Sequence, residues 1–463
     1  MTGKATLSEK IGYGFGDMSS SMFWKIFSYY LPFFYSNVFG LSLGHAGTLL
    51  LITKLYDAFS DPVMGMIADR TKTRWGRYRP YLLWCAIPFA LAGVLTFTTP
   101  DGSYAFKHAY AYISYIIMMT AYTAINVPYG AMLGVLTPDS REKTVFSSFR
   151  MFFAYAGSFI ALAIFEPLQN FFLSLGDGMS TSSCWQYSMI VVGAICAVLF
   201  VLCFLLTKER VVLPESGNGG SSSILKDFRS LVTNGPWWIL LVAAIGILLF
   251  NSIRGGAAAY YFKDVLGGNA IFTCGIFLAV GEVANMAGVA LAVPFSDRVG
   301  KKSAYIISLI AAAVMSIFIL FIPATPAGMW TLLGLQILIS IATGVTLPLL
   351  WSMFADVADY SELKNGNAST GLIFSSSSMA QKFGGAFGSA LILWVLAAYG
   401  YDTSETAVQT ASAVNGLKAM MSYIPSAGAL LAAAIVAFYP LTVKKMTEIS
   451  SALAARRSEN AQA

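Results

Sequence analysis

Residues 49–67 read LLLITKLYDAFSDPVMGMI, an apolar stretch long enough to cross a bilayer, interrupted by Lys54, Asp57 and Asp61. A carboxylate at membrane depth costs about 2.5–3.5 kcal/mol on insertion scales. Spacings of three and four place the three charged side chains on one face of a helix. Two carboxylates on one turn repel each other unless a proton or a metal cation is shared between them. The stretch therefore predicts a membrane helix with a cation site, as a cation-coupled transporter would need.

The composition extends this prediction to the whole chain. Of 463 residues, 57% are hydrophobic and only 11% are charged, and the mean hydropathy is +0.67. A soluble protein would carry about a quarter charged residues. The chain is therefore expected to be an all-α polytopic membrane protein with twelve spans. The predicted spans are 11–39, 44–68, 80–99, 109–136, 146–173, 185–207, 236–264, 269–296, 302–323, 328–355, 369–399 and 415–440.

Lysine and arginine residues set the expected orientation in the bilayer. The connection 68–79, ADRTKTRWGRYR, holds five basic residues, whereas the loops on the opposite side contain few beyond Lys107 and Lys418. Because basic loops stay inside, both termini are predicted to be cytoplasmic, in a bacterial inner membrane. The net charge of +6 expresses this bias and does not indicate a nucleic-acid partner.

The chain divides into two predicted halves. Residues 209–234 are rich in glycine, serine and charge, which predicts a cytoplasmic linker between six-helix bundles at 1–208 and 235–443, with a tail at 444–463. Each half repeats a loop pattern after its second span: Asp69-Arg70 with Gly76-Arg77, and Asp297-Arg298 with Gly300-Lys301. Such repeats are typical of transporters whose substrate binds near the midplane. The loops themselves are expected to have a structural role, capping the ends of helices.

Polar residues recur inside the apolar runs. In the first run Asp17, Ser21 and Lys25 follow one another at steps of four, along one helical face. Lys25 is expected to face a water-filled cavity, with a structural ion pair as the alternative. In the fourth run Thr123 and Asn126 lie one turn apart. A threonine hydroxyl can bind a small cation and an asparagine can bind a sugar hydroxyl, although both also serve as packing contacts between helices.

Further charged residues suggest binding, coupling or gating. Arg150 either anchors the cytoplasmic interface or binds sugar hydroxyls or a carboxylate through its guanidinium group. Arg254 and Glu282 are most simply paired with each other, as a structural pair or a gate. Two further groups lie in the second half: Ser378 and Lys382 share a helical face, and Asp356 and Asp359 stand at the cytoplasmic edge. Lys382 is expected to need a counter-charge from Asp57 or Asp61, and the aspartates to close the inner mouth through ion pairs.

Five motifs carry a resemblance to a known family. They are YGFGD at 13–17, KLYDAFSDPVMG at 54–65, TRWGRYRP at 73–80, NVPYG at 126–130 and ADVADYSELK at 355–364. Together they resemble the glycoside–pentoside–hexuronide:cation symporters, which have the major facilitator fold. The resemblance implies import of a sugar derivative driven by H⁺, Na⁺ or Li⁺, with no other cofactor.

The resemblance also implies roles for individual residues. Asp57 and Asp61 match the family's cation-binding pair, which would hold a metal only if the ion is Na⁺, with Thr123 as a further ligand. Lys54 matches the neighbouring basic residue, and Lys382 the lysine that links the cation and sugar sites. Arg150 matches an arginine of the sugar pocket.

Four positions depart from the pattern of galactoside-carrying members. Ser21 and Asn126 replace sugar-binding aspartates, Gly130 replaces a tryptophan, and Ser60 replaces an asparagine at the cation site. The resemblance therefore does not imply a galactoside.

A cation-coupled sugar symporter working by alternating access, as a monomer, is the hypothesis that these observations favour. The proton is slightly favoured as the ion, because Ser60 reaches less far than an asparagine. Lys25 and Arg254 favour an anionic sugar, while a neutral pentoside or glucoside stays open. An exporter of the same fold is the main alternative, ahead of a lipid carrier. A membrane enzyme is disfavoured because the spans contain no Ser/His/Asp arrangement or metal-ligand cluster.

Overall fold

The computed structural model describes residues 5–137, 140–176, 179–211, 232–267, 270–365, 370–404 and 407–462, and helices dominate throughout. Most of the linker predicted at 209–234 lies outside the described residues. Helices occupy each of the twelve predicted runs. Within the described ranges, nine helices are long and apolar enough to cross a membrane. The chain is thus a polytopic helical membrane protein.

The helices of the N-terminal part follow the predicted order. They are α1 (Leu7–Tyr29), α2 (Leu31–Phe33), η1 (Phe34–Val38), α3 (Leu43–Arg70), α4 (Arg79–Trp84), α5 (Ala86–Thr96), α6 (Tyr104–Leu136), α7 (Ser140–Ser174) and α8 (Thr181–Leu206). Thr6 starts α1 with a capping box, in which its side chain and that of Glu9 satisfy each other's backbone N–H groups. The predicted third span is broken at Cys85, so α5 alone is too short to cross a bilayer.

The C-terminal part continues with a second series of helices. They are α10 (Gly235–Tyr261), η2 (Phe262–Leu266), α11 (Cys274–Val299), α12 (Lys301–Phe318), η4 (Ile319–Phe321), α13 (Pro326–Asn365), α14 (Thr370–Ala398), α15 (Ala411–Met421), α16 (Tyr423–Ala437) and α17 (Val443–Gln462). Two π-helical segments occupy matching places, since η1 ends the first predicted span of one half and η2 ends the first span of the other.

The chain forms two compact units that do not coincide with its two sequence halves. Unit 1 contains residues 1–214 together with 255–283 and 389–417. Unit 2 contains 215–254, 284–388 and 418–463. Four helices, α10, α11, α14 and α15, therefore contribute residues to both units.

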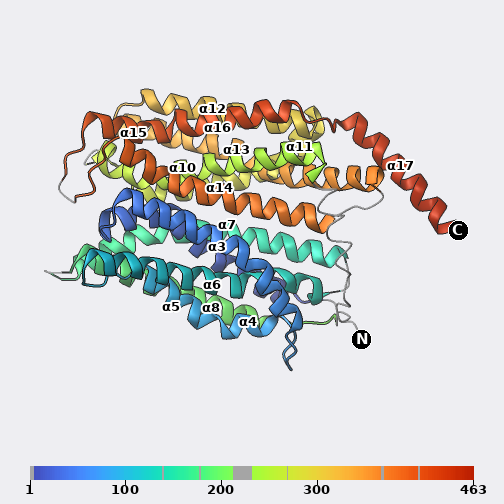
Figure 1. The fold of residues 1–463 in the computed structure, drawn as a ribbon, viewed down its shortest axis with the longest axis horizontal. Coiled ribbons are helices and arrows are strands. Elements are labelled where there is room, and N and C mark those ends of the chain that lie inside the picture. The colour runs from blue at the N-terminus through green and yellow to red at the C-terminus, as the bar shows by residue number, and fades with distance from the viewer. Residues whose placement is uncertain are drawn as a thin grey trace. The chain divides into compact units, whose positions relative to one another are not determined.

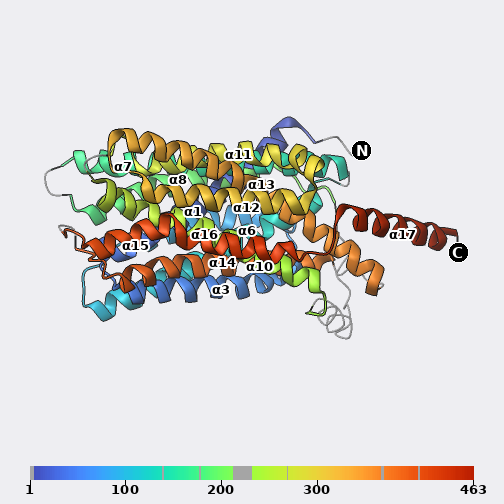
Figure 2. The same ribbon diagram turned by 90° about the horizontal axis from the view of Figure 1, so that it is seen from above.

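Unit 1 is built around α1, which packs most extensively against α7 and α8, while α3 and α5 both pack against α6. These helices run roughly along one another (Figures 1 and 2). The backbones of α1 and α7 approach closely at Gly157 of α7, where an added Cβ would lie 2.4 Å from the Met18 carbonyl oxygen. Only glycine permits this contact, because a backbone atom cannot move aside as a side chain can.

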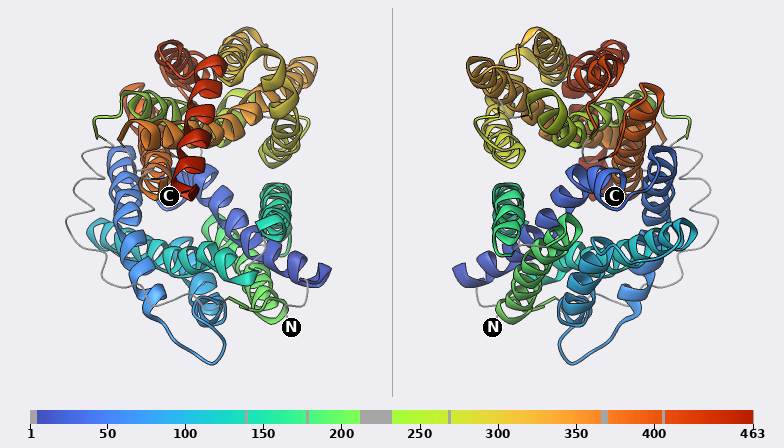
Figure 3. Two further views of the ribbon diagram at one scale, coloured as in Figure 1. Left: turned by 90° about the vertical axis from the view of Figure 1, so that its right-hand side faces the viewer. Right: turned by 90° about the vertical axis from the view of Figure 1, so that its left-hand side faces the viewer.

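Unit 2 centres on α12, which packs against α13 and α16, with α17 contacting α13. Seen end-on, these helices form a bundle (Figure 3). Lys301, at the start of α12, forms an ion pair with Asp356 of α13 at 2.8 Å. The repeated loop pattern recurs in the backbone, because Gly76 (φ +117°) and Gly300 (φ +83°) both have positive φ. Glycine is the residue best suited to that conformation.

Candidate functional site

The predicted cation-binding carboxylates lie on α3. This helix begins after the N-cap Ser42, runs for 28 residues and contains Pro62 one position after Asp61. Asp57 is buried, with 2% of its surface exposed, and Asp61 is half-buried. Residue spacing directs both towards α6, against which α3 packs. The sequence thus places two carboxylates at an interior helix contact.

A single hydroxyl joins these carboxylates. Thr123 Oγ1 of α6 lies 2.7 Å from Asp57 Oδ1 and 3.1 Å from Asp61 Oδ1. Ser60 Oγ is 3.3 Å from the same hydroxyl, and it also donates to the Asp57 carbonyl oxygen of its own helix at 3.0 Å. The structure therefore brings together all four residues that were predicted as cation ligands. A threonine hydroxyl has only one proton, so it can donate to one carboxylate at a time.

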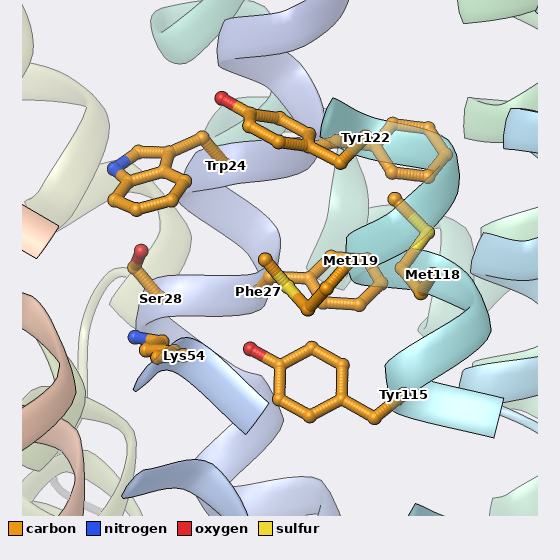
Figure 4. A pocket seen from close by; sticks show the side chains of 9 residues that line it. Trp24, Phe27, Ser28, Lys54, Tyr115, Met118, Met119 and Tyr122 are labelled. Carbon is orange, nitrogen blue, oxygen red and sulfur yellow. The ribbon is translucent and has the colours of Figure 1, made fainter. Parts of the chain in front are cut away.

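Lys54 lies on the same helix one turn before Asp57 and is buried, with 5% of its surface exposed. Its ammonium group donates to Ser389 Oγ of α14 at 2.7 Å and lies 5.7 Å from the centre of the Trp24 ring. Figure 4 shows Lys54 beside Ser28, at the edge of a small pocket faced by Tyr115 and Tyr122 of α6. Lys54 thus connects the cation helix α3 to α14 within unit 1.

Arg150 of α7 and Asp17 of α1 form an ion pair in the part of unit 1 where a sugar site was predicted. Arg150 Nε donates to Asp17 Oδ2 at 2.9 Å, and its guanidinium lies 5.3 Å from the centre of the Tyr129 ring. Asn126 of α6 accepts a hydrogen bond from Ser20 at 2.9 Å. Ser21 of α1 is half-buried. Charged, amide, hydroxyl and aromatic groups thus occur on neighbouring helices of one unit.

Lys25 forms an ion pair with an acidic residue. The sequence left this open as the alternative to a position facing a water-filled cavity. Its Nζ lies 2.5 Å from Glu282 Oε1 of α11 and 3.3 Å from the Tyr29 hydroxyl. The partner shown for Glu282 is therefore Lys25, whereas the sequence suggested Arg254. Arg254 is buried and donates to Gln336 Oε1 at 2.8 Å.

The other predicted residues lie in unit 2. Lys382 is half-buried on α14, and the side chain of Ser378 lies outside the described residues. Asp356 accepts from Lys301 with both carboxylate oxygens, and Asp359 is half-buried one turn later. Asp356 thus forms an ion pair within one unit, and its role at the cytoplasmic edge stays a prediction.

Sequence reasoning missed two polar clusters. In the first, Glu209 accepts hydrogen bonds from the backbone N–H groups of Arg77, Tyr78 and Arg79 at 2.7–2.8 Å, so a carboxylate occupies the N-terminus of α4. The charged run Lys208-Glu209-Arg210, directly after an apolar span, marks Glu209 in the sequence but does not identify its partners.

The second cluster, here called the outer network, consists of Ser36, Asn37, Tyr260, Asp264 and Tyr401. Ser36 Oγ lies 2.7 Å from both Asn37 Oδ1 and the Tyr260 hydroxyl. Asn37 donates to the Tyr401 hydroxyl at 3.1 Å, and Tyr401 donates to Asp264 Oδ2 at 2.5 Å. No local pattern in the sequence relates these distant positions.

Comparison with known proteins places the chain in a family. The family model described as MFS/sugar transport protein matches residues 12–443. A putative glycoside/cation symporter of Escherichia coli, YagG, is 36% identical over 461 residues, covering 99% of this chain and 97% of that protein. The isoprimeverose transporter of Lactiplantibacillus pentosus is 32% identical, covering 93% of this chain and 88% of that protein.

A solved structure shares the fold. The nucleoside transporter NupG superposes with a TM-score of 0.64 at 14% identity, covering 94% of this chain and 99% of the other. These comparisons agree with the motifs and with the helical architecture. The chain therefore belongs to the glycoside–pentoside–hexuronide:cation symporters of the major facilitator superfamily, and it is a cation-coupled sugar transport protein, not an enzyme.

Proposed function

We propose that Asp57, Asp61, Thr123 and Ser60 bind the coupling cation. The observation that carries this proposal is the Thr123 hydroxyl, which lies within hydrogen-bond distance of both carboxylates. Without a bound cation the two carboxylates repel each other. A cation held there neutralises one charge and relieves the repulsion between these two side chains of α3, so ion occupancy stabilises this part of unit 1.

The ion is proposed to be a proton. Because the Thr123 hydroxyl can donate to only one carboxylate, a proton on the other satisfies the remaining contact with no additional ligand. A sodium ion would need oxygen ligands from all four side chains, including the Ser60 hydroxyl. The Ser60 hydroxyl is already directed at the Asp57 carbonyl oxygen in its own helix.

Lys54 and Lys382 are proposed to couple the ion to the sugar. Lys54 is one turn from Asp57 and bonds to Ser389 of α14, the helix that also carries Lys382. A change of charge at Asp57 therefore acts directly on the contact that holds α3 to α14. By linkage, if the bound cation raises the affinity for sugar, the bound sugar must raise the affinity for the cation by the same factor.

The sugar is proposed to contact a set of polar residues on several helices. In unit 1 both basic groups of this set have acidic partners, Arg150 with Asp17 and Lys25 with Glu282. Because the Lys25–Glu282 pair carries no net charge, one of the two positive groups that favoured an anionic sugar is neutralised. This favours a neutral glycoside or pentoside, bound through hydroxyl groups. The proposed sugar contacts are Asp17, Ser21, Lys25, Asn126 and Arg150, with Ser378 from the second half.

Import is proposed to proceed by alternating access. Residues 255–283 and 389–417, which include two loops predicted to face outside, belong to the same compact unit as the N-terminal helices. The Lys25–Glu282 pair and the outer network hold them there. This favours a state with the outer side closed, and Glu282 serves as a gate residue.

Three residues of unit 2 complete the proposed gates. Asp356, which is paired with Lys301, and Asp359 are proposed to act in inner gating at the cytoplasmic edge. Arg254, which bonds to Gln336, is proposed as a further gating residue because a buried guanidinium must keep a partner as helices move.

The location follows from the basic loops and is proposed as the inner membrane, with both termini cytoplasmic and the chain working as a monomer. A fluorescent reporter that folds only in the cytoplasm, fused after Ala463, tests the orientation.

Gradient-driven uptake by membrane vesicles tests the cation site. Vesicles with an imposed proton gradient should accumulate radiolabelled methyl β-D-xyloside, and Asp57→Asn and Asp61→Asn should each abolish accumulation above equilibrium. Asp101→Asn, in an exposed loop, is the matched control and should transport normally. Accumulation that needs added sodium at a clamped pH gradient would show that sodium is the ion. Undiminished accumulation in both Asp57→Asn and Asp61→Asn would show that these carboxylates do not bind the coupling cation.

Competition tests the sugar. Unlabelled methyl β-D-xyloside should inhibit uptake more strongly than methyl β-D-glucuronide, because Lys25 and Arg150 are already paired with acidic side chains. Stronger inhibition by the glucuronide would restore the anionic alternative.

A further inference from the structure

A cavity of about 430 Å³ lies in unit 1, away from the cation site and the Arg150–Asp17 pair. It is lined by Tyr30 and residues of α2, α7, the start of α8, the end of α10, η2 and 270–274. These are the ends predicted to face outside the cell, because the basic loops mark the other side. Its volume falls within the range of small-molecule sites.

The walls combine aromatic rings with a few polar groups. Phe33 and Trp185 supply ring surfaces, and Glu166, Gln169 and Lys263 supply hydrogen-bonding groups. Glu166 Oε2 accepts from the Gly275 backbone N–H at 2.8 Å, which holds that carboxylate in place. Flat apolar faces beside hydrogen-bonding groups match a sugar ring, which has apolar C–H faces and a rim of hydroxyls.

Two polar groups of this wall have unused hydrogen-bonding capacity. Among the described residues, Gln169 Nε2 and the Tyr30 hydroxyl are buried and make no hydrogen bond. A buried donor without a partner costs about 1–3 kcal/mol, so such groups call for an explanation. A ligand hydroxyl that accepts a hydrogen bond from Gln169 would explain why this group is left without a partner.

We propose that this cavity is an outer docking site for the transported glycoside, distinct from the central sugar site. Glu166 and Lys263 bear opposite charges, so the site suits a neutral polyol over an anion. The inference rests on the proposed sugar transport and adds a binding step on the outer side. Such a step changes how sugar is captured and leaves the final accumulation ratio unchanged, because the ion gradient alone sets that ratio.

Cysteine protection tests occupancy of the cavity directly. Ala270 is exposed and lines the cavity, so Ala270→Cys is introduced after the five native cysteines are replaced by serine. Right-side-out vesicles are treated with a membrane-impermeant maleimide, with methyl β-D-xyloside, methyl β-D-glucuronide or neither. The xyloside should slow labelling at least about threefold, and the glucuronide should protect less. Adding Gln169→Ala removes one hydrogen bond to the sugar and should abolish the protection by the xyloside.

Two controls separate docking from its alternatives. Gln186→Ala removes a glutamine that bonds to Thr98 outside the cavity, and protection should persist. If protection arose only from a conformational change driven by the central site, it would survive Gln169→Ala, and the docking site would be wrong. Absence of protection in vesicles that still accumulate the sugar would also overturn the docking site while leaving the transport function intact. Absence of accumulation itself would overturn the proposed function.

Discussion

At the scale of single residues, the Thr123 hydroxyl is the most informative group. It lies 2.7 Å from Asp57 and 3.1 Å from Asp61, and Ser60 is 3.3 Å away. Hydroxyl side chains are common in helix packing, so neither Thr123 nor Ser60 would stand out alone. Their convergence with two carboxylates at an interior helix contact supports the proposed cation site by geometry as well as by motif.

Replacing Thr123 with valine should weaken ion binding and leave the fold intact, because valine has nearly the same shape. A hydrogen bond to a charged group is worth about 1.5–3 kcal/mol, so the half-saturating ion concentration for uptake should rise about tenfold or more. Thr123→Ser keeps the hydroxyl and is the matched control. An unchanged ion dependence in Thr123→Val would show that the hydroxyl does not serve the ion.

The sequence predicted local groupings better than distant ones. The spacing of Lys54, Asp57 and Asp61 places them on one helical face whatever surrounds the helix. The pairing of Lys25 with Glu282 joins positions 257 residues apart, and no period in the sequence encodes it. Thr123 became a candidate ligand mainly through the family resemblance, because its distance from α3 depends on how α3 and α6 pack.

At the scale of helices, close backbone contact organises unit 1. Gly157 brings α7 against the Met18 carbonyl of α1, and Gly16 makes room for the Tyr129 ring. Tyr129 in turn donates to the Tyr13 carbonyl oxygen at 2.7 Å, and its ring lies near the Arg150 guanidinium. The helices that present the proposed sugar contacts are thus positioned by glycine contacts.

Gly157→Ala should therefore destabilise the protein. The new methyl group would meet a backbone oxygen at 2.4 Å, and overpacking of this kind costs about 1–3 kcal/mol. Gly134→Ala on α6 is the matched control, since no atom lies within 4 Å of the added Cβ there. It should be neutral or stabilise by up to about 1 kcal/mol through helix propensity. Thermal unfolding of the purified protein measures both, and equal transition temperatures would contradict the contact.

Helix positions were largely predictable and their interruptions were not. Apolar runs located the helices because a span must hide its backbone polar groups in hydrocarbon. The break at Cys85 and the π-helical segments η1 and η2 follow no such rule. One of them, η1, makes a tertiary contact that no local pattern predicts, the hydrogen bond between Ser36 and Tyr260.

At the scale of the whole molecule, compact units and sequence halves differ. The composition of 209–234 predicts a boundary between two bundles in the order of the chain, and this division stays a prediction. Yet 255–283 and 389–417 are held with the N-terminal helices in unit 1. The repeated loop pattern indicates two related halves, whereas the compact units depend on contacts between residues far apart in the sequence, such as Lys25 with Glu282.

Tyr401→Phe should loosen the outer network and favour opening to the outside. It removes the hydroxyl that accepts from Asn37 and donates to Asp264. Loss of about 1–2 kcal/mol of hydrogen bonding should raise the open population several-fold. Ser28→Cys, beside the small pocket near Lys54, should then react faster with an impermeant maleimide added outside.

The matched control for this prediction is Tyr187→Phe, which removes the hydroxyl from an exposed ring of α8. It should leave the labelling rate of Ser28→Cys at the value measured without a tyrosine substitution. Equal labelling rates in the Tyr401→Phe and Tyr187→Phe backgrounds would refute a closing role for the outer network.

The paired π-helical segments have a consequence for how such a transporter can move. A wide turn contains one residue more than regular winding requires, and turns of this kind are frequent at functional positions. We expect the first helix of each half to change its length at η1 or η2. The polar residues deeper in the bilayer would then keep their orientation. Motion would then be absorbed at η1 and η2, and the proposed cation site on α3 and α6 would keep its alignment.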